Sequence, residues 1–226
     1  MKPTARMSSE DRRTAIIKTA QRVFVEKGFH RTTTRELAEA AGVSEALLFK
    51  HFPNKEALYS AIQMSCMDEQ GSKIARQLES LEPSTSALVL LVRDLACHML
   101  GKEPDEGVRS FIHLALRSLM DEGEFARLAI RGSPLQWVRK IEACIEAARA
   151  VGDMIEEPIR PNMGGWCAHQ LITGILLQFL PTTPLIDYGV SREELVKQVT
   201  WFCLRGMGMK ETAIQRYYRS LEISGD

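Results

Sequence analysis

TTRELAEAAGVSEALLFKHFPNKEAL, residues 33–58, is the stretch that decides how the first part of the chain folds. Thr33 followed by Glu36 has the spacing of a capping box, so a short helix is expected from Thr34 to Ala41. Gly42 interrupts the helical pattern directly afterwards, and glycine is the residue that most readily adopts the positive φ of a helix end. The stretch therefore predicts a short helix followed by a tight turn.

Helix-start residues continue on both sides of this turn. Ser44 is a candidate N-cap for a third helix, and Asn54 is a candidate N-cap for a fourth that runs from Lys55 to about Leu81. Upstream, Ser8 or Ser9 opens a first helix that Gly28 ends. The beginning of the chain is thus expected to form a compact group of short helices.

The requirements of a helix-turn-helix are met in one register that starts at Thr34. Ala38 is small enough for the two helices to approach closely, and Gly42 suits the turn. Apolar residues at the right spacing give the pair its own small core: Leu37, Ala41, Val43 and Leu48. The sequence therefore predicts a helix-turn-helix, with an αα-corner inside a helical bundle as the alternative.

The rest of the chain also shows helical periodicity, without the polar and apolar alternation of strands. We expect an all-α fold with a small head at residues 1–58 and a larger body at residues 59–226. Further helices are expected at Ser84–Leu100, Asp105–Leu119, Glu122–Arg131, Pro134–Val151, Met163–Leu180, Ser191–Met209 and Thr212–Glu222.

Charge is distributed unevenly between these two parts. The chain has 29 Lys and Arg and 29 Asp and Glu, so its formal net charge is zero. Residues 1–58 carry 11 basic against 7 acidic side chains, a net +4, which leaves 18 against 22, a net −4, for residues 59–226. A basic head on an acidic body fits a head that binds a polyanion.

Composition gives no sign of export or of a membrane span, and a cytoplasmic location is expected. The hydrophobic fraction of 45% and the charged fraction of 26% are ordinary for a globular protein. The longest charge-free stretch, Met163 to Ile186, contains polar residues, glycines and prolines, so a buried helix and its loop are expected there. The five cysteines are scattered without a CxxC pair, which predicts free thiols in a reducing compartment.

The quoted stretch resembles the DNA-binding domain of the TetR family of bacterial transcriptional repressors. The family pattern TxxxIAxxAGVSxGxLYxHFxxKxxL aligns without gaps, and the resemblance covers about residues 10 to 60. It implies a helix-turn-helix DNA-binding domain at residues 1–58 and a ligand-binding and dimerisation domain at residues 59–226. One departure from the pattern matters: Phe49 replaces the usual tyrosine, so no phosphate contact from a phenol is expected there.

The resemblance also implies a set of DNA-contacting positions. Base or phosphate contact is expected from Thr33, Thr34, Arg35, Ser44, Glu45, Ala46, Leu47, Lys50, His51 and Lys55. The first turn of the third helix holds one hydroxyl, one acid and two apolar residues, which favours readout of cytosine amino groups and thymine methyl groups. Lys55 opens the fourth helix, where an ammonium and free amides suit a phosphate.

Local roles compete with DNA contact at some of these positions. Glu45 is also suited to the dipole of the third helix as a first-turn acid. Arg35 has Glu39 one helical turn away as an ion-pair partner, and solvated surface is the alternative for Lys55. A basic arm or a disordered tail is expected from the segment that carries Lys2, Arg6, Arg12 and Arg13.

The last two long helices are expected to form the dimer interface, because the resemblance implies a four-helix bundle made from two subunits. The helix expected at Met163–Leu180 lacks charge and is apolar around most of its circumference, as a helix buried on two sides is. The interface candidates are Trp166, Gln170, Gly174, Gln178, Val199 and Phe202, with plain core as the alternative.

The helices in between are expected to enclose an effector site. Aromatic and methionine walls with few polar anchors suit a sizeable, largely apolar small molecule. The candidates are His98, Met99, Phe111, His113, Arg117, Met120, Trp137 and Cys144, with core packing as the alternative for each. No second ligand follows either histidine at i+3 or i+4, so neither a metal nor a cofactor is expected. The fourth helix is the expected lever between effector and DNA.

Other classes of protein fit the sequence less well. There is no HExxH motif, phosphate-binding glycine loop or nucleophile elbow, so no enzyme and no catalytic residue are expected. A ligand-independent DNA-binding protein and a thiol redox sensor using Cys97 or Cys144 are the alternatives, and an activator is the alternative to a repressor. The sequence favours a homodimeric, ligand-responsive repressor that binds a palindromic double-stranded operator.

Overall fold

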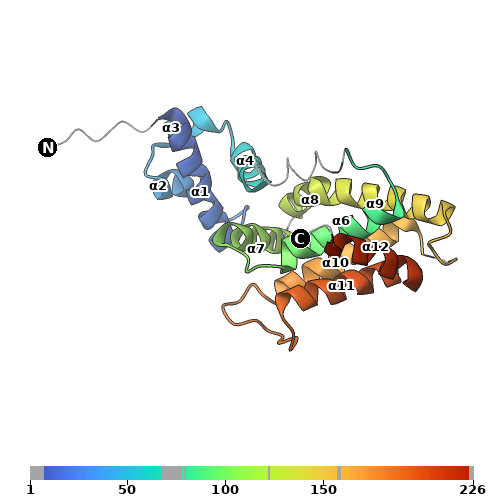
Figure 1. Cartoon of the computed structure of the whole chain (residues 1–226). Helices are drawn as coiled ribbons and strands as arrows, with labels where there is room; N and C mark the ends of the chain where they lie inside the picture. Colours follow the sequence, from blue (N-terminus) through green and yellow to red (C-terminus); the bar gives the residue numbers. More distant parts are fainter. Residues whose placement is uncertain (1–7, 68–77, 79, 122, 157–158, 224–226) are drawn as a thin grey trace. The chain divides into compact units, whose positions relative to one another are not determined.

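The structure is a computed structural model that describes residues 8–67, 78, 80–121, 123–156 and 159–223. Eleven helices lie within these ranges, together with an isolated β-bridge between Met154 and Met209 (Figure 1). The expected all-α fold is therefore confirmed. Among the helices described, none is both long enough and apolar enough to cross a membrane.

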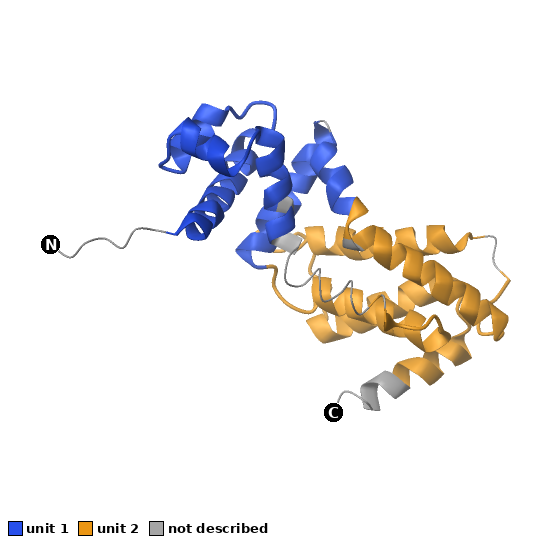
Figure 2. Cartoon of the chain, turned by 90° about the horizontal axis from the view of Figure 1, so that it is seen from above, with its two compact units in different colours: residues 1–72, 105–130 blue, residues 73–104, 131–226 orange. Residues whose placement is uncertain are grey.

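The chain divides into two compact units (Figure 2). The first contains residues 1–72 and 105–130, and the second contains residues 73–104 and 131–226. The first unit is larger than the head expected at residues 1–58, because the later segment 105–130 packs with it. A functional boundary at residue 58 stays a prediction.

The first four helices of the first unit begin where the sequence predicts them. Its helices are α1 (Ser9–Lys27), α2 (Thr34–Ala40), α3 (Glu45–His51), α4 (Lys55–Met67), α7 (Glu106–Met120) and α8 (Glu124–Arg131). α8 begins at Glu124 rather than at the expected Glu122, after the positive φ of Gly123. The side chains of Ser8, Thr33 and Ser44 accept backbone N–H groups as N-caps. Asn54 Oδ1 accepts the N–H of Ala57 at 2.7 Å. The continuation of α4 that the sequence predicts, to about Leu81, lies largely outside the described residues. Lys2 and Arg6 also lie outside them.

The core of the first unit is aromatic and joins helices that are distant in the sequence. Phe24 of α1 and Phe125 of α8 have no exposed surface. Tyr59 of α4 contacts both, with ring centroids 5.0 Å from Phe24 and 4.8 Å from Phe125. Phe111 of α7 continues the cluster at 5.4 Å from Phe125. α7 and α8 therefore share a core with the helix-turn-helix.

Arg117 of α7 also binds the end of α1. Its Nη1 donates to the carbonyl oxygens of Val25 at 3.0 Å and Glu26 at 2.8 Å. These carbonyls belong to the last turn of α1, where the helix dipole favours a cation. Gly28 ends α1 with φ +81°, and a Cβ at this position would lie 2.9 Å from Arg117 Nε. Both this positive φ and the close approach of Arg117 therefore favour glycine at residue 28.

The second unit packs its helices around α6 (Thr85–Leu100). The neighbours of α6 are α9 (Ser133–Ala150), α10 (Pro161–Leu177), α11 (Arg192–Gly206) and α12 (Glu211–Ile223). α6 is accordingly apolar, and Leu88 and Val92 have no exposed surface. α10 approaches α9 closely at Gly165, where an added Cβ would lie 3.2 Å from Val138. The charge-free segment thus begins as a helix that packs against α6 and α9 and continues as a loop after Leu177, as expected.

Candidate nucleic-acid interface

The turn between α2 and α3 has the geometry of a helix-turn-helix. Gly42 adopts φ +65°, and the N–H of Val43 donates back to the carbonyl of Ala38 at 3.0 Å. Leu37, Ala38 and Leu48 are each at most 2% exposed, so the pair has the small core that the sequence predicts. The placement of α3 on α2 is therefore set by local packing.

α3 buries one side and exposes the other. Leu48 is buried, and Leu47 and His51 are half-buried. The exposed residues are Ser44, Glu45, Ala46, Phe49 and Lys50. Phe49, which replaces the tyrosine of the family pattern, is 43% exposed. A seven-residue helix with an exposed first turn has the size that the major groove of B-DNA accepts.

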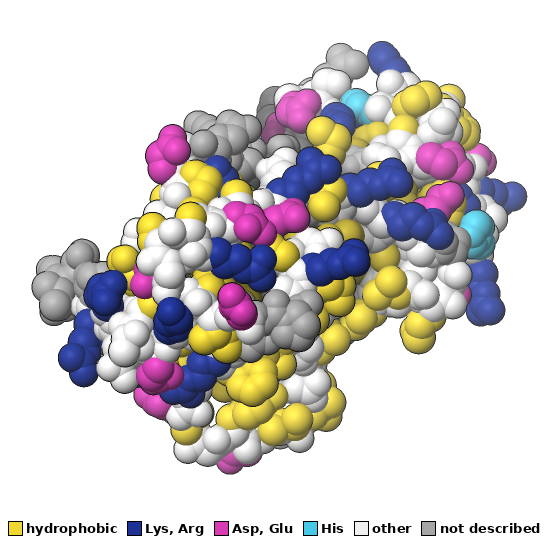
Figure 3. All heavy atoms as spheres, turned by 90° about the vertical axis from the view of Figure 1, so that its right-hand side faces the viewer, with side chains coloured by type: hydrophobic (Ala, Val, Ile, Leu, Met, Phe, Trp, Pro, Cys, Tyr) yellow, Lys and Arg dark blue, Asp and Glu magenta, His cyan; other side chains and the backbone are white. Residues whose placement is uncertain are grey.

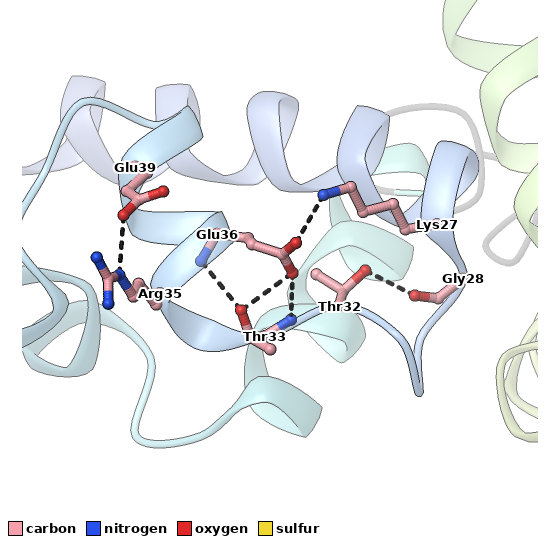
Figure 4. Close-up of polar contacts among 7 residues, drawn as sticks. All are labelled: Lys27, Gly28, Thr32, Thr33, Arg35, Glu36 and Glu39. Atoms are coloured by element: carbon pink, nitrogen blue, oxygen red, sulfur yellow. Dashed lines mark hydrogen bonds and ion pairs between the residues drawn. The ribbon is translucent and has the colours of Figure 1, made fainter.

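A capping box holds the N-terminus of α2 (Figure 4). Thr33 Oγ1 accepts the N–H of Glu36 at 3.2 Å, and the Glu36 carboxylate accepts the N–H of Thr33 at 2.9 Å. Lys27, at the end of α1, donates to the same carboxylate at 2.6 Å. The pKa of Glu36 is lowered to about 2, mainly by the hydrogen bond from Lys27 and secondly by the hydrogen bonds from Thr33. Thr33 thus has a structural role beside its expected phosphate contact.

The two residues after Thr33 contact acidic side chains. Thr34 Oγ1 donates to Glu45 Oε2 at 3.1 Å, which links the first turns of α2 and α3. Arg35 Nε lies 3.0 Å from Glu39 Oε1, and both side chains are more than half exposed (Figure 4). The ion pair considered from the sequence is therefore present. An exposed pair of this kind contributes little to stability, so it does not prevent Arg35 from contacting DNA.

Lys55 has a role that the sequence analysis did not include. Its Nζ donates to the carbonyl oxygens of Phe29 at 2.9 Å and Thr32 at 3.1 Å. It also lies 4.2 Å from the centre of the Phe29 ring. The Lys55 ammonium therefore closes the loop between α1 and α2. No local sequence signal indicates this contact, because Lys55 and Phe29 are 26 residues apart.

The eight residues expected to line an effector pocket fall in both units. Phe111, His113, Arg117 and Met120 belong to α7, whereas His98, Met99, Trp137 and Cys144 belong to α6 and α9. Met120 is 82% exposed, whereas Cys144 has no exposed surface. The Trp137 Nε1 donates to the carbonyl of Leu91 at 3.1 Å. The pocket stays a prediction, and the packing roles of Phe111, Arg117 and Trp137 agree with the core alternative.

A buried histidine that was not among the predicted site residues lies in the second unit. His169 of α10 is 7% exposed, and its ring centroid lies 6.3 Å from Trp137 and 6.0 Å from Trp166. Its Nδ1 has no hydrogen-bond partner among the described protein atoms. Burial lowers the pKa of His169 and so favours the neutral imidazole. No motif marks this residue, because the packing of α9 on α10 creates its surroundings.

The dimer candidates on α10 and α11 differ in exposure. Phe202 is 66% exposed and Gln170 is exposed, whereas Val199 is 6% exposed within the single chain. Trp166, Gly174 and Gln178 are half-buried. The face drawn in Figure 3 mixes basic and acidic side chains with exposed hydrophobic ones. Core packing thus accounts for Val199, and Phe202 is the apolar candidate that a partner would cover.

The fold and this interface define a class of protein: an all-α chain whose N-terminal helix-turn-helix presents an exposed third helix. Residues 16–62 match the family model described as "Bacterial regulatory proteins, tetR family". This segment of the chain therefore carries the DNA-binding region of the TetR family of transcriptional regulators.

Sequence relatives extend the similarity beyond the matched segment. The HTH-type transcriptional regulator HbdR of Aromatoleum sp. (strain CIB) is 30% identical over 145 residues, which cover 64% of this chain and 61% of HbdR. The next two curated relatives match over 57 and 75 residues, and the chain spans 30 to 61% of the length of these first three.

Two solved structures share the fold along most of the chain. NalD, the secondary repressor of the MexAB-OprM multidrug efflux pump in Pseudomonas aeruginosa, has a TM-score of 0.67 at 21% identity, over 90% of this chain and 100% of NalD. AibR, solved with isovaleryl coenzyme A and operator DNA, has a TM-score of 0.57 at 20% identity, over 84% of this chain and 97% of AibR. At these identities the likeness is one of fold.

Proposed function

We propose that this chain is a homodimeric, ligand-responsive transcriptional repressor that binds a palindromic operator by inserting α3 into the major groove. The observation that carries the proposal is the exposed first turn of α3, held on α2 by the Gly42 turn and a buried core. Such a helix meets base edges with its N-terminal residues while flanking groups contact phosphates.

Phosphate contacts are assigned to basic residues beside this first turn. Lys50 and His51 lie in the last turn of α3. Lys55 uses two N–H donors on the carbonyls of Phe29 and Thr32, so a third is left for a phosphate. These cations give the interaction a salt-dependent, sequence-independent component.

A dimer supplies the second reading helix that genomic specificity requires. Two-fold dimers of helix-turn-helix proteins place their reading helices about 34–36 Å apart, one turn of DNA. The 66% exposure of Phe202 on α11 supports α10 and α11 as the interface, because isolated large apolar side chains on adjoining helices are covered when subunits pair.

We assign release of the operator to a largely apolar small molecule that binds the helical body. Such a ligand lowers DNA affinity when it prefers the conformation in which the reading helices are misplaced. α4 is one lever, and α7 is a second within the first unit, because Arg117 binds the last turn of α1. AibR, a protein of the same fold that was solved with isovaleryl coenzyme A and operator DNA, supports the coarser point that this fold binds both a small molecule and DNA.

Two alternative functions, a thiol redox sensor and an enzyme, gain no support from the cysteines or from the family. Burial raises the pKa of Cys97 and of Cys144, which favours the unreactive thiol over the thiolate that a redox sensor needs. The family is one of regulators rather than enzymes, and no catalytic residue is proposed.

Binding-site selection from a random duplex library, with purified full-length protein, tests the proposal. The expected product is a two-fold symmetric site occupied by two subunits, and titration of apolar ligands is expected to weaken the complex. A monomer that selects no duplex overturns the DNA-binding assignment. A dimer that binds its operator equally well with every ligand overturns the effector assignment alone.

A further inference from the structure

Glu45 creates an electrostatic problem for the reading helix. It is exposed in the first turn of α3, so in the proposed complex its carboxylate enters a groove bordered by phosphates. A carboxylate only accepts hydrogen bonds, and the major-groove edges that donate are cytosine N4 and adenine N6. Adenine also presents N7, an acceptor that repels the anion, so cytosine is the better partner. The carboxylate further needs a cation beside it.

The first turn of α2 supplies that cation. Thr34 Oγ1 donates to Glu45 Oε2 at 3.1 Å and holds the carboxylate against this turn, where Arg35 is the next residue. The charges of Arg35 and Glu45 interact in the free protein: the pKa of Arg35 is raised mainly by Glu39 and to a smaller extent by Glu45. A guanidinium matches the O6 and N7 acceptors of guanine, the partner of cytosine. Arg35 and Glu45 are thus complementary to the two halves of one base pair.

We propose that Arg35 and Glu45 together read a single C·G pair in each half-site, Glu45 accepting from cytosine N4 and Arg35 donating to guanine O6 and N7. This inference rests on the proposed function, because it requires α3 in the major groove. Thr34 is a positioning residue: its hydroxyl engages one carboxylate oxygen of Glu45 and leaves the other for cytosine. Glu39 holds Arg35 in the free protein and is replaced by guanine in the complex.

Binding-site selection with full-length variants tests this base-pair assignment. Glu45→Gln is the diagnostic change, because an amide matches N6 and N7 of adenine. It is expected to weaken the preference for C·G at one position per half-site and to admit A·T there, while Arg35 still favours guanine. Thr34→Val is expected to weaken the C·G preference at the same position about five- to tenfold, and Thr34→Ser to retain it.

Arg35→Lys completes the set, because lysine lacks the two-donor fork that matches guanine. It is expected to relax the same position, whereas Arg31→Lys, an exposed change just before α2, is expected to leave every position unchanged. Circular dichroism establishes that each variant folds. If Glu45→Gln and Thr34→Val lower affinity equally for all sequences or alter no base preference, the pair does not read DNA and Glu45 serves the helix dipole. A wild-type protein that selects no duplex overturns the proposed function itself.

Discussion

Lys55 combines two roles at the scale of a single residue. Its ammonium bonds to two carbonyl oxygens in the loop that joins α1 to α2. Lys55→Met is expected to lower the free energy of unfolding by about 1–3 kcal/mol, because hydrogen bonds from a charged donor are lost and two carbonyls lose their partner. Urea denaturation measures this difference.

Lys50→Met is the matched control for Lys55. Lys50 is exposed on α3, so its replacement is expected to change stability by less than about 0.5 kcal/mol while weakening DNA binding. Equal stability of the two variants would show that the contacts of Lys55 with the loop contribute nothing to folding.

His169 predicts a pH dependence of stability. Burial lowers its pKa below the ordinary value of 6.5, so below that pH the unfolded chain binds a proton that the folded chain excludes. The stability associated with the neutral ring is therefore complete above about pH 6.5 and is lost as the pH falls through that value toward the folded-state pKa. The Tm of the wild-type protein is expected to fall on acidification from about pH 7.5 to 5.5.

His169→Gln does not titrate, so its Tm is expected to fall less over the same range. Some loss remains, since burial also lowers the pKa of His98. His113→Gln, at an exposed position of α7, serves as the control and is expected to behave like the wild type. Parallel Tm curves for His169→Gln and the wild type would contradict the assignment.

The glycines that follow α1 and α2, Gly28 and Gly42, are expected to differ in how much stability is lost when each is replaced by alanine. Gly28 and Gly42 both have a positive φ, but only at Gly28 does an added Cβ meet another group, Arg117 Nε at 2.9 Å. Gly28→Ala is therefore expected to destabilise the protein by about 1 kcal/mol more than Gly42→Ala, because it also displaces Arg117 from the carbonyls of α1. Denaturant titration of both variants compares the costs, and an equal loss would show that the Arg117 contact is not coupled to Gly28.

Local elements were predictable because their signals lie within a few residues. The N-caps at Ser8, Thr33, Ser44 and Asn54 occur where the sequence places them, since a cap requires only a side chain and a backbone N–H three residues later. The exposed face of α3 followed from the same register. The replacement of the usual tyrosine by Phe49 is visible only against the family pattern, because hydrophobic periodicity does not distinguish the two residues.

Contacts between distant segments were not predictable from one sequence. Arg117 and Val25 are 92 residues apart, and no motif associates α7 with the helix-turn-helix. The hydrogen bond from Thr34 to Glu45 likewise depends on the angle between α2 and α3, which residue spacing does not specify. Burial of His169 depends on the packing of tryptophans from two helices.

In the proposed function, operator binding depends on dimerisation, a property of the whole molecule. Phe202→Asp is expected to produce monomers, because a carboxylate in an apolar interface loses its hydration without gaining a partner. Sedimentation equilibrium measures the change, and operator affinity is expected to fall with it. Leu185→Asp alters a side chain that is similarly exposed, at 70%, before α11 begins, and is expected to leave the dimer intact. A dimer that persists in Phe202→Asp would remove this face of α11 from the interface.

The claim that α3 reads DNA sequence is tested most directly by one comparison: the affinity of the full-length protein for its selected operator against a scrambled duplex, at rising salt. Both affinities are expected to fall linearly on logarithmic axes between about 50 and 200 mM salt, with the operator preferred by roughly 10³-fold or more. Equal affinity for the two duplexes at every salt concentration would contradict the claim.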